Sequence, residues 1–292
     1  MIYDCVTYNG EEELWDIHYN CLKPYVDQFI VCEAPTTFSG EAKPLYFERI
    51  KDKYPDVIYH VIDENWIEEE KMQAWTSPNT VGPPHWTREF LQKESIKKAL
   101  LTVDRIKGTS KLHDGTNLNF ELHGPPKDDD IIFIGDVDEI WDKSALKLTG
   151  TYKLKLKVYT YYLNNRSSEE FWGTLKTTYG HMKGLCLNHL RMGAIRTQHH
   201  RGWHFTSQAR DLHKKLTDSY TQESYATPYV LDRLQANIDS NRDFLGRDFN
   251  YWEDTKKWPA YLKNNREKYR HLCKETTEDL HTTSGTIKQP EV

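Results

Sequence analysis

Short apolar runs alternate with helix-like segments along the first half of the chain. Four runs bounded by polar or turn-forming residues predict strands: IYDCVTY (2–8), QFIVCE (28–33), DVIYHVID (56–63) and DDIIFIGD (129–136). Apolar residues at helical spacing predict two helices between them, one with Leu14, Ile17 and Cys21 and one with Ile96, Ala99, Leu100 and Val103. Such alternation is typical of parallel sheets covered on both faces. We therefore expect an α/β fold with a mostly parallel central sheet flanked by helices.

The pattern changes at YKLKLKVYTYYL (152–163), where apolar residues alternate with lysines. This period predicts a strand with one exposed face. A stretch rich in Gly, His and Trp and a polar helical region follow, without a repeat or a low-complexity linker. We expect a single domain over residues 1–281, with a sheet-centred half (1–145) and a less regular half (146–281). The composition of residues 282–292 predicts a disordered tail.

Composition narrows the possible functions. The 292 residues have a formal net charge of −5, which gives no general field for nucleic acid. No apolar run approaches the roughly 18 residues that a membrane span needs. The five cysteines are an odd number without Cys-x-x-Cys spacing, which indicates reduced thiols. These features predict a cytoplasmic protein that binds neither nucleic acid nor membrane. An aromatic content of 13% suits a carbohydrate ligand, although core packing explains it equally well.

Two carboxylates follow the last predicted strand of the first half. Asp136 and Asp138 are one residue apart, so in extended backbone both point the same way, beyond the carboxyl end of the strand where α/β sheets bind ligands. Like charges this close repel unless a cation lies between them. Oxygen ligands without thiolates favour Mn²⁺ or Mg²⁺, which leave positions open for phosphate oxygens. The pattern predicts a site for a metal-bound diphosphate; an acidic loop that caps the next helix is the alternative.

Five ordered segments carry a resemblance to a known family. They are IYDCVTYNGEEELWDIHYNCL, VDQFIVCEAPTTFSGEAKPLYF, HWTREFLQKESI, IIFIGDVDEI and RGWHFTS. Their order and spacing resemble glycosyltransferase family 17, the group that includes the β-1,4-mannosyl-glycoprotein β-1,4-N-acetylglucosaminyltransferases, from residue 2 to about residue 225. The resemblance implies a single GT-A type domain, a nucleotide-sugar donor, a divalent metal and inversion at the anomeric carbon. The characterised branch uses UDP-N-acetylglucosamine. His18 stands where the family usually has arginine.

The resemblance also assigns roles to residues. It implies a donor and metal half (1–145) and an acceptor half (146–281). His204, in the shared GWHF segment, would complete the metal shell of Asp136 and Asp138. On the donor side we expect Thr7, Glu33, Lys43, Arg88 and Asp136, since an arginine such as Arg88 suits bidentate phosphate contacts. Trp172 and Trp203 are candidates for stacking on acceptor sugars, with core packing as the alternative for both.

An inverting transfer needs a base that takes the proton of the acceptor hydroxyl. Glu170 and Glu223 flank the tryptophan segments of the second half and are the candidates, followed by His204 and Glu139. We therefore expect a metal-dependent inverting glycosyltransferase with a saccharide or glycoconjugate acceptor. A Mg²⁺-dependent phosphohydrolase or nucleotidyltransferase and a non-catalytic sugar-binding protein are the alternatives.

Overall fold

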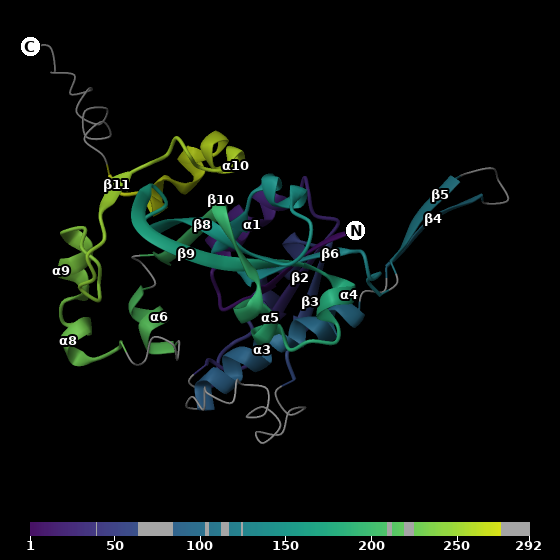
Figure 1. Cartoon of the computed structure of the whole chain (residues 1–292), viewed down its shortest axis with the longest axis horizontal. Helices are drawn as coiled ribbons and strands as arrows, with labels where there is room; N and C mark the ends of the chain where they lie inside the picture. Colours follow the sequence, from purple (N-terminus) through teal and green to yellow (C-terminus); the bar gives the residue numbers. More distant parts are fainter. Residues whose placement is uncertain are drawn as a thin grey trace, which may run out of the picture.

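The computed structural model describes residues 1–38, 40–63, 84–102, 105–111, 117–123, 125–208, 212–218 and 225–275. Its centre is a nine-stranded sheet with the order β3-β2-β1-β6-β9-β8-β10-β7 and with β11 paired to β9. The strands are β1 (Ile2–Thr7), β2 (Gln28–Glu33), β3 (Val57–Val61), β6 (Ile131–Asp136), β7 (Glu139–Trp141), β8 (Tyr152–Tyr161), β9 (Asn165–Thr178), β10 (Ile195–Gln208) and β11 (Tyr251–Glu253). A separate antiparallel hairpin, β4 (Arg105–Lys111) and β5 (Asn117–His123), projects away from this sheet (Figure 1).

Helices cover both faces of the sheet. The α-helices are α1 (Glu12–Leu22), α3 (Pro84–Leu101), α4 (Tyr179–Met182), α5 (Leu187–Gly193), α6 (Leu212–Asp218), α8 (Pro228–Leu231), α9 (Leu234–Asp239) and α10 (Ala260–Asn264). The short 3₁₀ helices are η1 (Phe47–Arg49), η2 (Lys51–Lys53), η4 (Lys143–Lys147) and η5 (Arg266–Leu272). Figure 1 shows α1 and α10 on one side of the sheet and α3 and α5 on the other. No helix in the described ranges is long and apolar enough to cross a membrane.

The predicted elements of the first half are confirmed. The four apolar runs form β1, β2, β3 and β6, and the two periodic segments form α1 and α3, although Val103 lies outside the described residues. The strands β1, β2 and β6 are buried because each face meets helices, whereas β3, at the edge of the sheet, is only partly buried. Leu14, Trp15 and Ile17 of α1 pack on one face, while Ile96 and Leu100 of α3 pack on the other. This burial on both faces explains why the strands read as continuous apolar runs.

The expectation of a mostly parallel sheet is wrong, because the sheet is mixed. The strands β3, β2, β1 and β6 pair in parallel, but β9 is antiparallel to both β6 and β8. The cause is the connection between β8 and β9, which is only residues 162–164. A parallel pair needs a crossover of a dozen or more residues, so a link this short forces the chain to turn back. The expected tail, 282–292, lies outside the described residues.

Candidate active site

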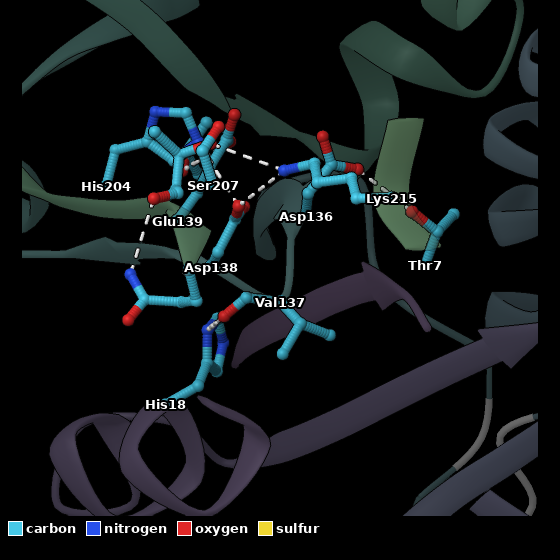
Figure 2. A network of polar contacts seen from close by, with 12 residues as sticks. Thr7, His18, Asp136, Val137, Asp138, Glu139, His204, Ser207 and Lys215 are labelled. Atoms are coloured by element: carbon cyan, nitrogen blue, oxygen red, sulfur yellow. Dashed lines mark hydrogen bonds and ion pairs between the residues drawn. The ribbon is translucent and has the colours of Figure 1, made fainter. Parts of the chain in front are cut away.

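The two aspartates lie where β6 ends and the chain turns into β7. Asp136 is the last residue of β6 and is in parallel register with Thr7, the last residue of β1. The Thr7 hydroxyl donates to Asp136 Oδ1 at 2.9 Å. Two residues later, the carbonyl of Asp138 accepts from the backbone N–H of Phe205 in β10 at 2.9 Å. The segment is therefore held between the parallel strands and β10, and both carboxylates are at the carboxyl edge of β6 (Figure 2).

Asp136 has a fixed cationic partner from α3. The Lys93 ammonium donates to Asp136 Oδ1 at 3.0 Å and to Oδ2 at 3.2 Å, and its side chain is only 8% exposed. Burial raises the pKa of Asp136, but the charges of Lys93 and then Arg191 outweigh it, so the pKa lies below its ordinary value. The carboxylate is ionised near neutral pH and, at 40% exposed, remains accessible to a ligand.

The carboxylate of Asp138 is more buried, and its ion-pair partners among the described residues are distant. Its Oδ2 lies 3.4 Å from both His204 Nε2 and Lys215 Nζ, which is long for a hydrogen bond, and its side chain is 13% exposed. Burial opposes ionisation, but His204 and then Lys215 hold the pKa of Asp138 well below its usual range. The pKa of His204 is lowered by burial and raised more strongly by Asp138, so it lies above the ordinary value. These three charges form one cluster (Figure 2).

Glu139 is a third carboxylate, buried beside the aspartates. Its side chain is 1% exposed and accepts from the Thr174 hydroxyl at 3.1 Å. Two glycines leave room for it: a Cβ on Gly173 would lie 2.5 Å from Glu139 Oε1, and one on Gly135 would lie 2.9 Å from Oε2. Burial, followed by the charge of Asp136, raises the pKa of Glu139. A raised pKa suits a carboxyl group that exchanges a proton near neutral pH.

His18 supports this turn from the opposite side. Its Nδ1 lies 3.0 Å from the carbonyl oxygen of Val137, and its Nε2 lies 2.7 Å from Asp4 Oδ1. Trp141 donates to the other oxygen of Asp4 at 2.6 Å. Both ring nitrogens of His18 therefore lie within hydrogen-bond distance of an oxygen atom. Figure 2 shows the His18 ring beside Val137, the residue that stands between Asp136 and Asp138 in the sequence.

Metal ligands are only partly assembled in this arrangement. Among the described residues, no group of three or more His, Cys, Asp or Glu side chains is placed to hold an ion. Asp136 and Asp138 nevertheless supply two carboxylates at one strand edge, and Mn²⁺ or Mg²⁺ is often held by one or two carboxylates plus substrate phosphates. The long contacts of Asp138 leave its charge incompletely satisfied, which fits an added cation.

Comparison with known proteins bears on the N-terminal part of the chain. Residues 1–110 match the sequence model of glycosyltransferase family 17. The resemblance carried by the sequence motifs is thereby confirmed for the segments that contain Thr7, Glu33, Lys43 and Arg88. No curated protein matches the chain in a sequence search. The match supports a glycosyltransferase, with a nucleotide-sugar donor and a saccharide acceptor, and it ends before Asp136.

Within the family 17 segment, Glu33 anchors the loop that follows β2. Its side chain is 0% exposed, and both oxygens accept from protein donors. These donors are Lys43 Nζ at 3.1 Å, Tyr46 N at 2.7 Å, Phe47 N at 2.9 Å and the Tyr59 hydroxyl at 2.9 Å. Glu33 and Lys43, both expected on the donor side, are therefore brought together as an internal pair that shapes the loop.

Arg88 of the same family 17 segment packs against this loop. Gly40 has a φ of +97°, and a Cβ there would lie 2.7 Å from Arg88 Cζ. Arg88 Nη1 approaches the carbonyl of Phe38 at 3.4 Å. Glycine at position 40 permits both the positive φ and the close approach of the guanidinium. Arg88 thus lies beside the loop at the carboxyl edge of β2, and a direct contact with the donor stays a prediction.

The expected acceptor residues lie on β9 and β10, at different depths. Trp203 is 8% exposed, packs in the core and donates from Nε1 to the carbonyl of Lys257. Trp172 is half-buried and donates from Nε1 to the carbonyl of Thr197 at 3.0 Å. Glu170 is 63% exposed and forms an ion pair with Lys155. Glu223 lies outside the described residues.

Two cations of the site were not expected from the sequence. Lys93 lies four residues after Glu89 in the family 17 segment HWTREFLQKESI, and it faces the same side of α3. That spacing was a usable signal, because i and i+4 residues share a helix face. Lys215 of α6 follows no motif, and its role depends on how α6 packs beside β10, which no local pattern encodes.

Proposed function

We propose that this protein is a metal-dependent inverting glycosyltransferase that transfers a sugar, N-acetylglucosamine from UDP-N-acetylglucosamine, to a saccharide acceptor. The observation that carries the proposal is Asp138, an ionised and largely buried carboxylate whose partners both lie 3.4 Å away. Asp136 lies beside it at the same strand edge, 40% exposed. The family 17 match over residues 1–110 supports the class of reaction, and the resemblance of the motifs supports the donor.

Asp136, Asp138 and His204 would hold Mn²⁺ or Mg²⁺. A bound ion would offset the charge of the departing diphosphate. Lys93 and Lys215 stay close enough to contribute positive charge on the same side, as their contacts with the two aspartates indicate. His204 must be neutral to ligate, so the affinity for metal would rise with pH.

Proton removal from the acceptor is the second requirement. Glu139 supports this role better than Glu170 does, because burial raises its pKa and it lies beside Asp136. The ion pair with Lys155 lowers the pKa of Glu170, which makes it a weaker base. Glu223 remains a candidate. Replacing the true base by Gln is expected to lower the rate by roughly 10² to 10⁴ with donor affinity nearly unchanged.

The first experiment compares Asp138→Asn with the wild type and with Asp128→Asn. Asp128 is an exposed aspartate paired with Lys183, so its variant controls for the loss of one carboxylate. We expect Asp138→Asn to lower Mn²⁺-dependent release of UDP from UDP-N-acetylglucosamine by at least about 100-fold, with the circular dichroism spectrum unchanged. Wild-type turnover in Asp138→Asn at the same Mn²⁺ concentration would contradict the proposal.

Donor identity is tested by ligand-induced thermal stabilisation in Mn²⁺, because a ligand of the native state raises apparent stability. UDP, UDP-N-acetylglucosamine, UDP-glucose and GDP-mannose are compared at one concentration. The uridine compounds are expected to stabilise most. A larger shift with GDP-mannose would contradict the uridine donor, and phosphate release from UDP-sugar without glycosyl transfer would favour a phosphohydrolase.

A further inference from the structure

Three cations of the second half of the chain lie near the carboxylate site, where the charge of Arg191 acts on Asp136 and Glu139. They are Lys153 of β8, Arg191 of α5 and Arg196 of β10, and we call them the cation cluster. Lys153 and Arg196 are direct neighbours in the parallel register of β8 and β10. No described carboxylate forms an ion pair with any of the three. In a chain with 44 acidic residues and a net charge of −5, this local excess of positive charge requires a cause.

The members of the cluster repel one another. Burial lowers the pKa of Lys153, and the charge of Arg191 lowers it further, as do Arg196 and Lys93. The charge of Glu139 raises the pKa of Lys153, but this effect is smaller than the combined lowering by burial and the other cations. Such crowding of like charges opposes folding, and it is common where a site is arranged for a ligand instead of for stability.

Trp172 holds one member of the cluster in place. Its indole is fixed by the hydrogen bond from Nε1 to the carbonyl of Thr197, and the Arg196 guanidinium lies 5.1 Å from the ring centroid. Lys155 lies 5.0 Å from the same centroid, but Glu170 neutralises it. A cation held against an indole is oriented without being neutralised. Arg196 therefore keeps its charge available to a ligand.

The position of the cluster indicates which substrate it contacts. In the sheet order, β8 and β10, which carry Lys153 and Arg196, lie across β9 from Asp136 of β6 and away from β1 and β2 of the family 17 segment, while β7 with Glu139 lies on the other side of β10. Lys93 and Lys215 already supply positive charge beside the two aspartates. We propose that the cation cluster binds an anionic group, a carboxylate or a phosphate ester, on the acceptor saccharide. This inference rests on the proposed function and adds the chemical class of its acceptor.

The test measures binding to the whole 292-residue chain, so that it does not depend on turnover. Glucuronic acid and glucose 6-phosphate are the anionic probes, glucose is the neutral control, and UDP with Mn²⁺ reports on the donor side. Isothermal titration calorimetry compares the wild type with Lys153→Ala/Arg196→Ala. The matched control is Lys263→Ala/Arg266→Ala, which removes two exposed positive charges from α10 and η5.

We expect one or both anionic probes to bind the wild type and the control at least about 10-fold more tightly than glucose, with affinity falling as salt is added. The cluster variant should lose this preference and keep its affinity for UDP within about twofold. Its melting temperature should stay equal or rise by about 1–3 °C, because mutual repulsion is relieved. A structural role for the cations would instead lower it.

Each contrary result has a separate meaning. Equal binding of glucose and both anions by the wild type would overturn the inference. Weaker UDP binding in the cluster variant, with probe binding unchanged, would overturn it in favour of a diphosphate site. Anion binding in a wild type that binds no uridine nucleotide would overturn the proposed function and the assignment of the anion to an acceptor. Preference for glucose 6-phosphate or for glucuronic acid identifies the source of the anion.

Discussion

The two halves of the sheet differ in how their charged side chains are paired. In the parallel half, Glu33 is satisfied by four protein donors, and Asp4 is satisfied by His18 and Trp141. In the half made by β8, β9 and β10, the half-buried Lys153 and the exposed Arg196 lie side by side and form no ion pair with a described carboxylate. Internal pairing fixes a shape in advance of ligand binding. Unpaired charge leaves an interaction for the ligand to complete.

The boundary between the two kinds of charge agrees with the end of the family 17 match. The matched residues, 1–110, contain the satisfied charges that shape the loop after β2, whereas the cation cluster begins at Lys153. This division fits the donor role that we propose for the parallel half and the acceptor role that we propose for the other half. The comparison is tested by measuring what each charge contributes to the free energy of unfolding. Paired charges should stabilise the fold, and unpaired charges should not.

The largest effect is expected at Glu33. Glu33→Ala would leave Lys43 buried at 6% exposure without its partner and would remove the acceptor of two backbone N–H groups. Breaking a buried pair in this way costs about 3–5 kcal/mol of unfolding free energy. Urea unfolding followed by fluorescence measures it. Glu48→Ala, which removes an exposed partner of Lys51, is the control and should cost less than about 1 kcal/mol. Equal losses in both variants would break the comparison.

The sequence predicts the parallel half well because the signal there is local. Continuous apolar runs give β1, β2, β3 and β6, and the position of Asp136 at a strand end follows from the same pattern. The strands β9 and β10 gave no such signal. Their sequences, NRSSEEFWGTLKTT and IRTQHHRGWHFTSQ, are mixed in polarity, because β9 is buried only in part and β10 is exposed along its first residues. Their strand character comes from pairing with neighbours.

The candidate site likewise contains some residues that the sequence predicts and others that only tertiary packing brings together. The family resemblance groups Asp136, Asp138 and His204 into one site, and in the fold His204 Nε2 lies 3.4 Å from Asp138 Oδ2. Lys215 could not be found in this way, because it reaches Asp138 from a helix 77 residues away in sequence. A lysine has no spacing rule relative to a distant strand. The residues that sequence reasoning missed are those whose role depends only on packing.

A smaller effect is expected at Gly173, where the two halves meet. A Cβ at this position would lie 2.5 Å from Glu139 Oε1 and 2.6 Å from Phe171 Cε1, so Gly173→Ala must displace one of them. Overpacking of this kind costs about 1–3 kcal/mol. Thermal unfolding and UDP release are measured together, with Gly184→Ala as the control, since nothing lies within 4 Å of a Cβ there. Unchanged stability and UDP release in Gly173→Ala would show that Glu139 is not confined by this glycine.

The smallest effect concerns His200, the register neighbour of Lys155 in the cationic half. Burial and then the charges of Arg166, Lys157 and Lys155 lower its pKa from 6.5 to about 4. The unfolded chain therefore binds a proton at His200 as pH falls below about 6.5, whereas the folded chain does so only near pH 4. Between these values His200 makes the fold less stable as pH decreases.

His200→Gln should remove this pH-dependent loss of stability. The loss is less than about 1 kcal/mol, because the ring is exposed and screened by solvent. Urea unfolding of both proteins at pH 7 and pH 4.5 measures the difference, which should shrink in 1 M salt. An identical pH dependence in both proteins at low salt would mean that the cations near His200 do not act on it, and the contrast between the two halves would weaken at this position.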